Sequence, residues 1–216
     1  MIKRFKWTLK DIIVLCVLGI AFGALYMGGV GIWGLVNGIL GPYGLELVYG
    51  IWFTASITAF YIIRKPGIAL GAEMLAALGE VLLGTPAGVG VFIGAFVQGI
   101  ASEAVFAITK WKNYSTPVLV LAGMAPSVTT FIYTYFLYGY GSFPVPMLIS
   151  MLAIRLVSGA ILAGLLGKAI GDGLAATGAL STFPLGREMA EKKEKILSKA
   201  KEEARSMIRE AKELSD

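Results

Sequence analysis

Six long apolar segments dominate this sequence and limit what it can fold into. An α-helix rises 1.5 Å per residue, so roughly 17–25 apolar residues are enough to cross a hydrocarbon core about 30 Å thick. Segments of this kind lie near residues 11–28, 46–63, 67–83, 88–109, 117–138 and 147–170. The sequence therefore predicts an all-α integral membrane protein with six transmembrane helices.

The charge distribution separates this apolar body from a polar tail. Only 15% of the 216 residues are charged, against about 25% in a typical soluble domain. The first 186 residues hold 10 Lys or Arg and 6 Asp or Glu, whereas residues 187–216 hold 9 and 8. We expect a membrane domain over residues 1–180 and a charged cytoplasmic tail over residues 181–216.

Positive charges mark every second connection between the predicted spans. Lys and Arg are absent from the connections near 29–45, 84–87 and 139–146. They occur in the others: Lys3, Arg4, Lys6 and Lys10 before the first span, Arg64 and Lys65 after the second, Lys110 and Lys112 after the fourth, and Lys168 at the end of the sixth. Because cytoplasmic loops carry the excess of Lys and Arg, both termini are predicted to be cytoplasmic in a multi-pass cell-membrane protein. The basic residues form no face interleaved with aromatics, so the net charge of +5 does not indicate nucleic acid.

The first outer connection, residues 29–45, is glycine-rich and uncharged but still apolar. A solvated loop would be more polar, and backbone at membrane depth must be covered by protein. This segment is therefore predicted to be a lid or re-entrant loop over the helices.

The tail has the pattern of an amphipathic helix. Its apolar residues recur at alternating spacings of three and four, with charges between them: Leu197, Ala200, Ala204, Met207, Ala211 and Leu214. Two interpretations stay open, a solvated cytoplasmic extension and a helix that packs on a partner.

Four acidic residues, Glu46, Glu73, Glu80 and Glu103, fall within the predicted spans or at their margins. A charge at the centre of a membrane helix costs about 2.5–3.5 kcal/mol on insertion scales, and such residues usually pair or line a cavity. Arg155 is the single base away from the cytoplasmic ends, and Glu80 is the first candidate to neutralise it. The alternative is that these groups only hold the helices together.

Aromatic and polar residues accompany these acids in the outer half of the chain. Trp33, Asn37, Tyr49 and Trp52 lie within twenty residues of one another, around Glu46. Carboxylates and aromatic faces both attract cations, so the outer region is predicted to bind a cationic ligand. An ordinary interfacial belt of Trp and Tyr is the alternative for each aromatic taken singly.

Enzyme chemistry finds little support in the sequence. There is no histidine, and Cys16 is the single cysteine, so neither a Ser-His pair nor a thiolate metal site is available. The sequence Gly167-Lys168-Ala169 lacks the Ser or Thr and the upstream spacing of a Walker A motif. We expect a transport subunit with no catalytic residues, metal site or cofactor, which would depend on a separate ATPase if transport uses ATP.

One stretch carries a more specific resemblance. The sequence RKPGIALGAEMLAALGEVLLGTPAGVGVFIGAFVQGIASEAVF, together with WTLKDIIVL at the start of the first span, resembles the YkoE-type substrate-binding (S) components of energy-coupling factor (ECF) transporters. The resemblance spans most of residues 5–180. It implies a six-helix subunit that binds thiamine or its hydroxymethylpyrimidine (HMP) precursor from outside and assembles with a transmembrane coupling subunit and ATPase subunits.

The resemblance also implies roles for particular residues. Thiamine carries a fixed positive charge, so Glu80 or Glu46 is expected to face the cation and Trp33 or Trp52 to stack on a ring. Gln98 could bond the pyrimidine, or it could make a plain interhelical hydrogen bond. The coupling surface on the first helix would fall at Gly19 and Gly23.

Two other functions remain open at this stage. A stand-alone carrier could couple substrate to a proton or another cation through Glu73, Glu80 and Glu103, since buried acids serve as proton relays in transporters. A scaffold or an intramembrane enzyme has the least support, because no nucleophile-base pair or metal cluster stands out in the sequence.

Overall fold

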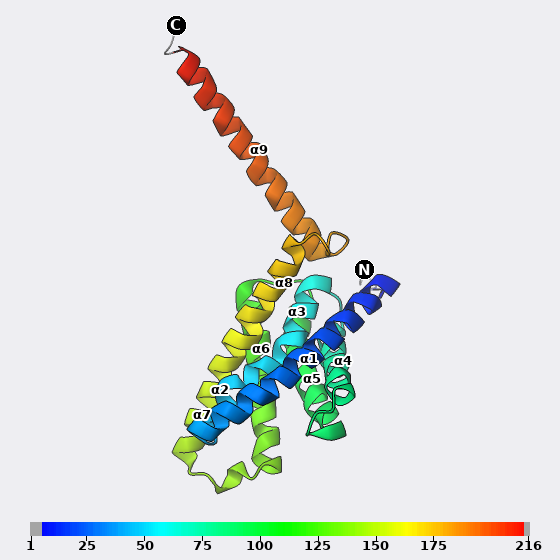
Figure 1. Cartoon of the computed structure of the whole chain (residues 1–216), viewed down its shortest axis with the longest axis vertical. Helices are drawn as coiled ribbons and strands as arrows, with labels where there is room; N and C mark the ends of the chain where they lie inside the picture. The colour runs from blue at the N-terminus through cyan, green and yellow to red at the C-terminus, as the bar shows by residue number, and fades with distance from the viewer. Residues whose placement is uncertain (1–5, 214–216) are drawn as a thin grey trace. The chain divides into compact units, whose positions relative to one another are not determined.

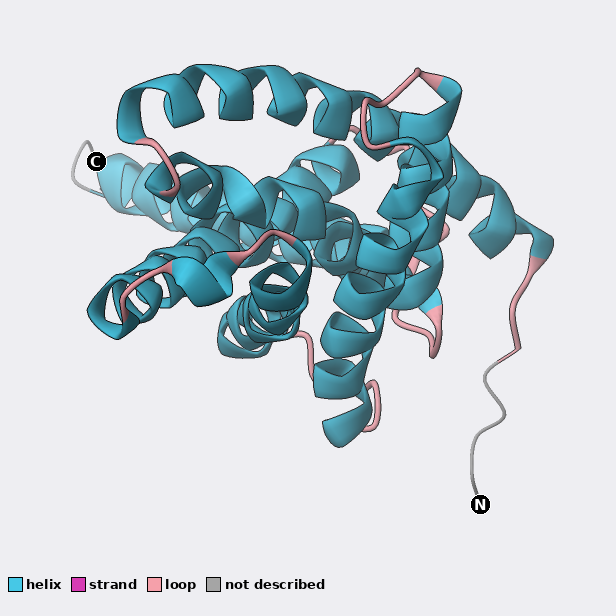
Figure 2. Ribbon diagram, turned by 90° about the horizontal axis from the view of Figure 1, so that it is seen from below, coloured by secondary structure: helices cyan, strands magenta, loops and turns pink. Residues whose placement is uncertain are grey.

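The computed structural model describes the backbone of residues 6–213 and the side chains of residues 6–207. Within this range the chain is helical and contains no strand (Figures 1 and 2). It divides into two compact units, Met1–Gly171 and Asp172–Asp216. The domain boundary expected near residue 180 stays a prediction.

The helices, in chain order, are α1 (Leu9–Leu40), α2 (Tyr43–Val48), the 3₁₀ helix η1 (Tyr49–Phe53), α3 (Thr54–Ile63), α4 (Ile68–Leu82), η2 (Gly88–Gly90), α5 (Val91–Ile108), α6 (Thr116–Leu137), η3 (Tyr140–Ser142), α7 (Val145–Ser158), the π-helix η4 (Gly159–Leu165), α8 (Leu166–Ala176) and α9 (Pro184–Glu213). Five stretches among the described residues are long and apolar enough to cross a membrane: Leu9–Leu40, Tyr43–Ile63, Gly88–Ile108, Thr116–Leu137 and Val145–Ala176. The predicted all-α membrane class is therefore confirmed. The remaining predicted span corresponds to α4, which has only 15 residues.

The segment expected to form a lid or re-entrant loop is mostly helical, so that prediction is wrong. α1 continues without interruption to Leu40 and is 32 residues long. No proline interrupts it, and a helix satisfies the backbone of an apolar segment internally, whatever its glycine content. Gly41, at φ 58°, ends the helix by donating its amide to Asn37 O at 2.9 Å. Gly41 and Pro42 then turn the chain back into α2.

Close packing of α1 on α4 uses the two glycines that the family resemblance assigned to the coupling surface. A Cβ on Gly19 would lie 2.4 Å from Leu75 Cβ, and one on Gly23 would lie 2.7 Å from Gly79 Cα. Real Cβ atoms do not approach this closely, so these positions require glycine. This face of α1 is consequently buried within the chain, and the expectation that it forms the surface for another subunit is wrong.

The stretch α2–η1–α3 lies along α7–η4–α8 with the same chain direction. Gly50 packs on the backbone of Ser158, where a Cβ would lie 2.2 Å from the carbonyl oxygen. Farther along, Thr54 Oγ1 donates to Leu162 O at 3.0 Å and Thr58 Oγ1 to Gly167 O at 3.1 Å. The irregular helix η1 therefore faces the π-helix η4, and interruptions of this kind often lie at functional sites.

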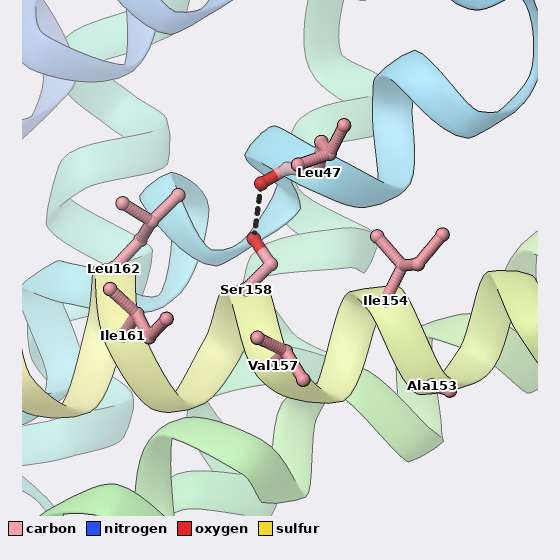
Figure 3. Close-up of a pocket in the computed structure, with 7 residues that line it drawn as sticks. All are labelled: Leu47, Ala153, Ile154, Val157, Ser158, Ile161 and Leu162. Atoms are coloured by element: carbon pink, nitrogen blue, oxygen red, sulfur yellow. Dashed lines mark hydrogen bonds between the residues drawn. The ribbon is translucent and has the colours of Figure 1, made fainter.

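The Ser158 side chain hydrogen-bonds the backbone at the junction between α2 and η1. Its hydroxyl accepts from Gly50 N at 2.9 Å. It also donates to Leu47 O at 2.8 Å (Figure 3). It also belongs to an otherwise apolar surface groove of about 480 Å³, lined by Leu47, Ala153, Ile154, Val157, Ser158, Ile161 and Leu162. None of the predicted ligand-binding residues lines this groove.

The second unit contains α9, the predicted tail helix. Leu180, Phe183 and Leu185 are buried around its first turn, whereas Leu197 and Met207 are 51% and 68% exposed. The apolar positions predicted along the tail therefore lie on a helix, and Leu197 and Met207 among them are exposed. The side chain of Ala211 and the whole of Leu214 lie outside the described residues. Both interpretations of the tail remain.

Replacing Ser158 with alanine should destabilise the fold. The substitution leaves a buried amide and a carbonyl without their partner, and we expect it to lower the free energy of unfolding by roughly 1–3 kcal/mol. Thermal unfolding of the detergent-solubilised protein, followed by tryptophan fluorescence, would measure this. Ser142→Ala is the control because its hydroxyl makes only an exposed local bond to Gly139 O. Equal melting temperatures for the two variants would contradict the role of Ser158.

Candidate ligand-binding site

Glu46 and Arg155 form a buried ion pair that joins α2 to α7. Both residues are 0% exposed. Arg155 Nε donates to Glu46 Oε2, and Nη2 donates to Oε1 at 2.8 Å. Tyr140 Oη adds a bond to Oε1 at 2.7 Å, and Arg155 Nη1 reaches Thr130 Oγ1 at 3.3 Å.

This pair corrects the expectation that Glu80 neutralises Arg155. The partner is Glu46, because the turn at Gly41–Pro42 brings α2 back into the bundle and carries Glu46 to the side of α7. Burial, followed by the nearby Glu46 carboxylate, raises the pKa of Tyr140, so its phenol stays protonated as a donor. Both oxygens of Glu46 are thus engaged, which leaves this carboxylate poorly suited to face a ligand.

Tyr49 and Trp52 connect the ion pair with Glu80. The guanidinium carbon of Arg155 lies 3.9 Å from the centre of the Tyr49 ring, and the Tyr49 ring meets Trp52 edge-on at 6.1 Å. Trp52 Nε1 donates to Glu80 Oε1 at 3.4 Å, near the limit of a hydrogen bond. Glu80 is only 4% exposed, and the described part of the chain gives it no ion-pair partner.

Glu73, two turns before Glu80 on α4, has a different environment. Tyr26 Oη lies 3.2 and 3.1 Å from its two oxygens, and Ser56 N donates to Oε1 at 2.9 Å. Tyr26 Oη in turn accepts from Ala55 N at 2.9 Å. Glu73 therefore ties α1, α3 and α4 together, as the interhelical-bond alternative expects.

Glu103 also has a structural role. Its Oε1 accepts from Gly67 N at 2.7 Å and Trp111 Nε1 at 2.6 Å, and its Oε2 accepts from Ala69 N at 3.0 Å and Leu70 N at 3.4 Å. The first amides of a helix lack intrahelical partners, and a carboxylate also interacts favourably with that end of the helix dipole. Glu103 on α5 thus caps α4.

Of the remaining predicted site residues, Trp33 and Gln98 have buried or nearly buried polar groups, whereas Asn37 is exposed. Trp33 Nε1 is buried and has no hydrogen-bond partner among the described residues. Trp33 lies one turn after Gly29, where a Cβ would be 3.4 Å from the Trp52 ring. Gln98 on α5 is 8% exposed, and its carboxamide makes no hydrogen bond to the described residues. Asn37 is exposed, so the structure does not bring it into this set.

The contacts bring together Tyr49, Trp52 and Glu80, and Trp33, on the same face of α1 as Gly29, completes the candidate ligand-binding site as the residue with an unpartnered buried donor. It combines indole and phenol rings with one buried, incompletely bonded carboxylate, which suits a ligand that is both aromatic and cationic. Gln98 is a further candidate with free hydrogen-bonding capacity. No described group of three or more His, Cys, Asp or Glu side chains could hold a metal ion.

Sequence reasoning singled out Arg155 but expected Glu80 as its partner, and it missed Tyr26 and Tyr140 as members of this polar network. Arg155 could have been linked to Glu46 only by knowing that α2 folds back along α1. Tyr26 was signalled weakly, since Tyr26, Gly29 and Trp33 share one helical face at spacings of three and four. Tyr140 lies in the predicted outer connection, where a tyrosine is expected to face the interface rather than the bundle.

A bundle of apolar helices that buries incompletely bonded polar groups among aromatics fits a membrane protein that binds a small ligand. Comparisons with known proteins specify the family. Residues 10–129 match the family model for the permease component of ABC-type cobalt transport systems. The chain is 48% identical over 190 residues to the protein named as an HMP/thiamine permease, YkoE, of Bacillus subtilis (strain 168), covering 88% of this chain and 96% of the relative. A crystal structure of an S component of an ECF transporter matches with a TM-score of 0.86 at 47% identity, covering 89% of this chain and 98% of that one.

The chain belongs to the YkoE family of S components, the substrate-binding membrane subunits of ECF transporters. This confirms the family inferred from the Arg64–Phe106 stretch. It also decides between the earlier hypotheses in favour of a transport subunit over a stand-alone carrier or a scaffold.

Glu103→Gln should weaken the fold by disturbing the cap of α4. An amide presents an N–H group toward backbone amides that need acceptors, so we expect a loss of about 1–3 kcal/mol in the free energy of unfolding. Thermal unfolding in detergent would measure it, with Glu202→Gln on the exposed surface of α9 as the matched control. A melting temperature equal to that of the control would remove the capping role.

Proposed function

We propose that this protein captures thiamine or its HMP precursor at the outer face of the cell membrane and delivers it to the other subunits of an ECF importer. The observation that carries the proposal is the state of Glu80. Its carboxylate is buried, makes one long hydrogen bond to Trp52, and has no ion pair within the described residues. The name of the 48% identical relative supports the same ligand class.

The chemistry of thiamine fits the candidate site. Its thiazolium ring carries a permanent positive charge, which a buried carboxylate stabilises more strongly than water-exposed groups can. Its two rings can stack on Trp33 and Trp52, while Gln98 can bond the pyrimidine. Glu80, rather than Glu46, is proposed to face the cation, because Glu46 is occupied by Arg155 and Tyr140.

The membrane arrangement forms part of the proposal. We take α4 as the sixth span, although it has 15 residues, because it packs along α1 and α5 and both neighbours are long enough to cross a bilayer. The distribution of Lys and Arg then places both termini in the cytoplasm. This subunit has no ATPase of its own in the proposal; a transmembrane coupling subunit and ATPase subunits would supply it.

Replacing Glu80 with glutamine should separate the two ligands. Loss of the carboxylate removes the electrostatic partner of thiazolium, so the Kd for thiamine should rise about tenfold or more, equivalent to roughly 1.4 kcal/mol. The Kd for neutral HMP should change less than about twofold. Quenching of tryptophan fluorescence in the purified protein would measure both titrations.

Glu103→Gln serves as the control for this experiment, since it removes a half-buried carboxylate from outside the proposed site. Unchanged thiamine affinity in Glu80→Gln would show that the cation lies elsewhere. A wild-type protein that binds neither thiamine nor HMP would contradict the proposed function itself.

The proposed topology predicts which residues are reached from outside the cell. In a Cys16→Ser background, a membrane-impermeant maleimide should label Ser142→Cys in intact cells. Ser198→Cys should be labelled only after the membrane is permeabilised. The reverse pattern, or labelling of both variants in intact cells, would overturn the assignment of the two faces.

A further inference from the structure

The Arg155 side chain has partners on several sides, and the stability of the fold alone does not require all of them. Its guanidinium group bonds both oxygens of Glu46 and approaches Thr130, and it lies 3.9 Å from the Tyr49 ring centre and 5.0 Å from that of Phe131. Removing two charges from water is costly, and apolar residues that replace a buried ion pair are often neutral or stabilising. The structure therefore suggests a second use for the pair.

The contacts of Arg155 lead toward the candidate site. Its flat face covers Tyr49, the first residue of η1, and Tyr49 meets Trp52 within the same short helix. Trp52 is the residue that donates to Glu80. A continuous line of contacts thus runs from the buried ion pair through two aromatic rings to the carboxylate proposed to bind the ligand.

Ser158 lies three residues after Arg155, on the same face of the same helix. It binds the backbone at Leu47 and Gly50, on either side of the start of η1. Helix α7 therefore contacts η1 in two ways. Ser158 hydrogen-bonds the backbone of η1, and Arg155 packs on the ring of Tyr49, the first residue of η1. A 3₁₀ helix has poorer hydrogen-bond geometry than an α-helix, so it gains more from such external support.

We propose that Arg155 is a positioning residue for ligand binding. It sets the orientation of Tyr49 and Trp52, which form the aromatic wall of the site. This inference rests on the proposed function, because it concerns the same site. Arg155 does not touch the ligand, so its contribution is the same for thiamine and for HMP, whereas that of Glu80 is confined to the cation.

Arg155→Lys tests this directly. Lysine keeps the charge but loses the flat stacking face and the two-pronged bond to Glu46. We expect the Kd values for thiamine and HMP to rise together by about tenfold, because both ligands would meet a misplaced aromatic wall. The emission of Trp52, compared in matched variants with the other tryptophans replaced by phenylalanine, should shift because its surroundings change.

The single variant could lose affinity simply because it unfolds, so a double variant, Glu46→Gln with Arg155→Met, tests the same role in a folded protein. It removes both charges together and is expected to keep the melting temperature, while thiamine and HMP affinities still fall together. Glu103→Gln is the matched control, which should lose stability without losing affinity for either ligand.

The outcomes separate the inference from the function on which it rests. Affinities for both ligands within twofold of wild type in the folded Arg155 variants would overturn the positioning role. A loss confined to thiamine would also overturn it, because it would indicate a direct electrostatic effect on the cation. Failure of the wild-type protein to bind either ligand would refute the proposed function instead.

Discussion

The structure depends on the need to satisfy polar groups inside an apolar bundle. Water is absent from the hydrocarbon core, so a buried carboxylate without a partner on another helix lowers the stability of the fold. Glu46 pairs with Arg155 on α7, Glu73 bonds Tyr26 on α1, and Glu103 caps α4 from α5. The first two contacts join elements far apart in the sequence, and the third joins the consecutive helices α4 and α5. The acids therefore help to fix an arrangement of helices that apolar faces alone would specify poorly.

Glu80 differs from the other three acids because its carboxylate is incompletely bonded, and this difference makes it the candidate to bind a ligand. A carboxylate that is 4% exposed and has one long hydrogen bond is not explained by packing or by helix capping. Trp52, its hydrogen-bond donor, belongs to η1, the irregular part of the Tyr43–Ile63 span. The least satisfied of the four acids therefore lies beside a stretch of irregular backbone.

The sequence predicted the membrane class and the approximate helix positions, because apolar length is a local property. It did not predict that residues 29–40 would extend α1, since glycine content indicates a loop unless the lipid environment outweighs it. The candidate residues Glu80, Trp52, Tyr49 and Trp33 were found from their chemistry. Their partners were not: whether Glu46 or Glu80 neutralises Arg155 depends on the fold-back at Gly41–Pro42, and one sequence carries no signal for that tertiary contact.

The glycine-mediated contacts explain why η1 and η4 can face each other at all. Gly50 brings the backbone of η1 against Ser158, and Gly159 brings the start of η4 against Gly123 of α6. At such distances the helices contact through their backbones, as small residues allow. Arg155 lies just before this junction on α7 and holds Tyr49 on the opposite side. The aromatic residues proposed to form the wall of the site thus lie on a short helix whose backbone packs directly against α7, and in this proposal α7 sets their geometry.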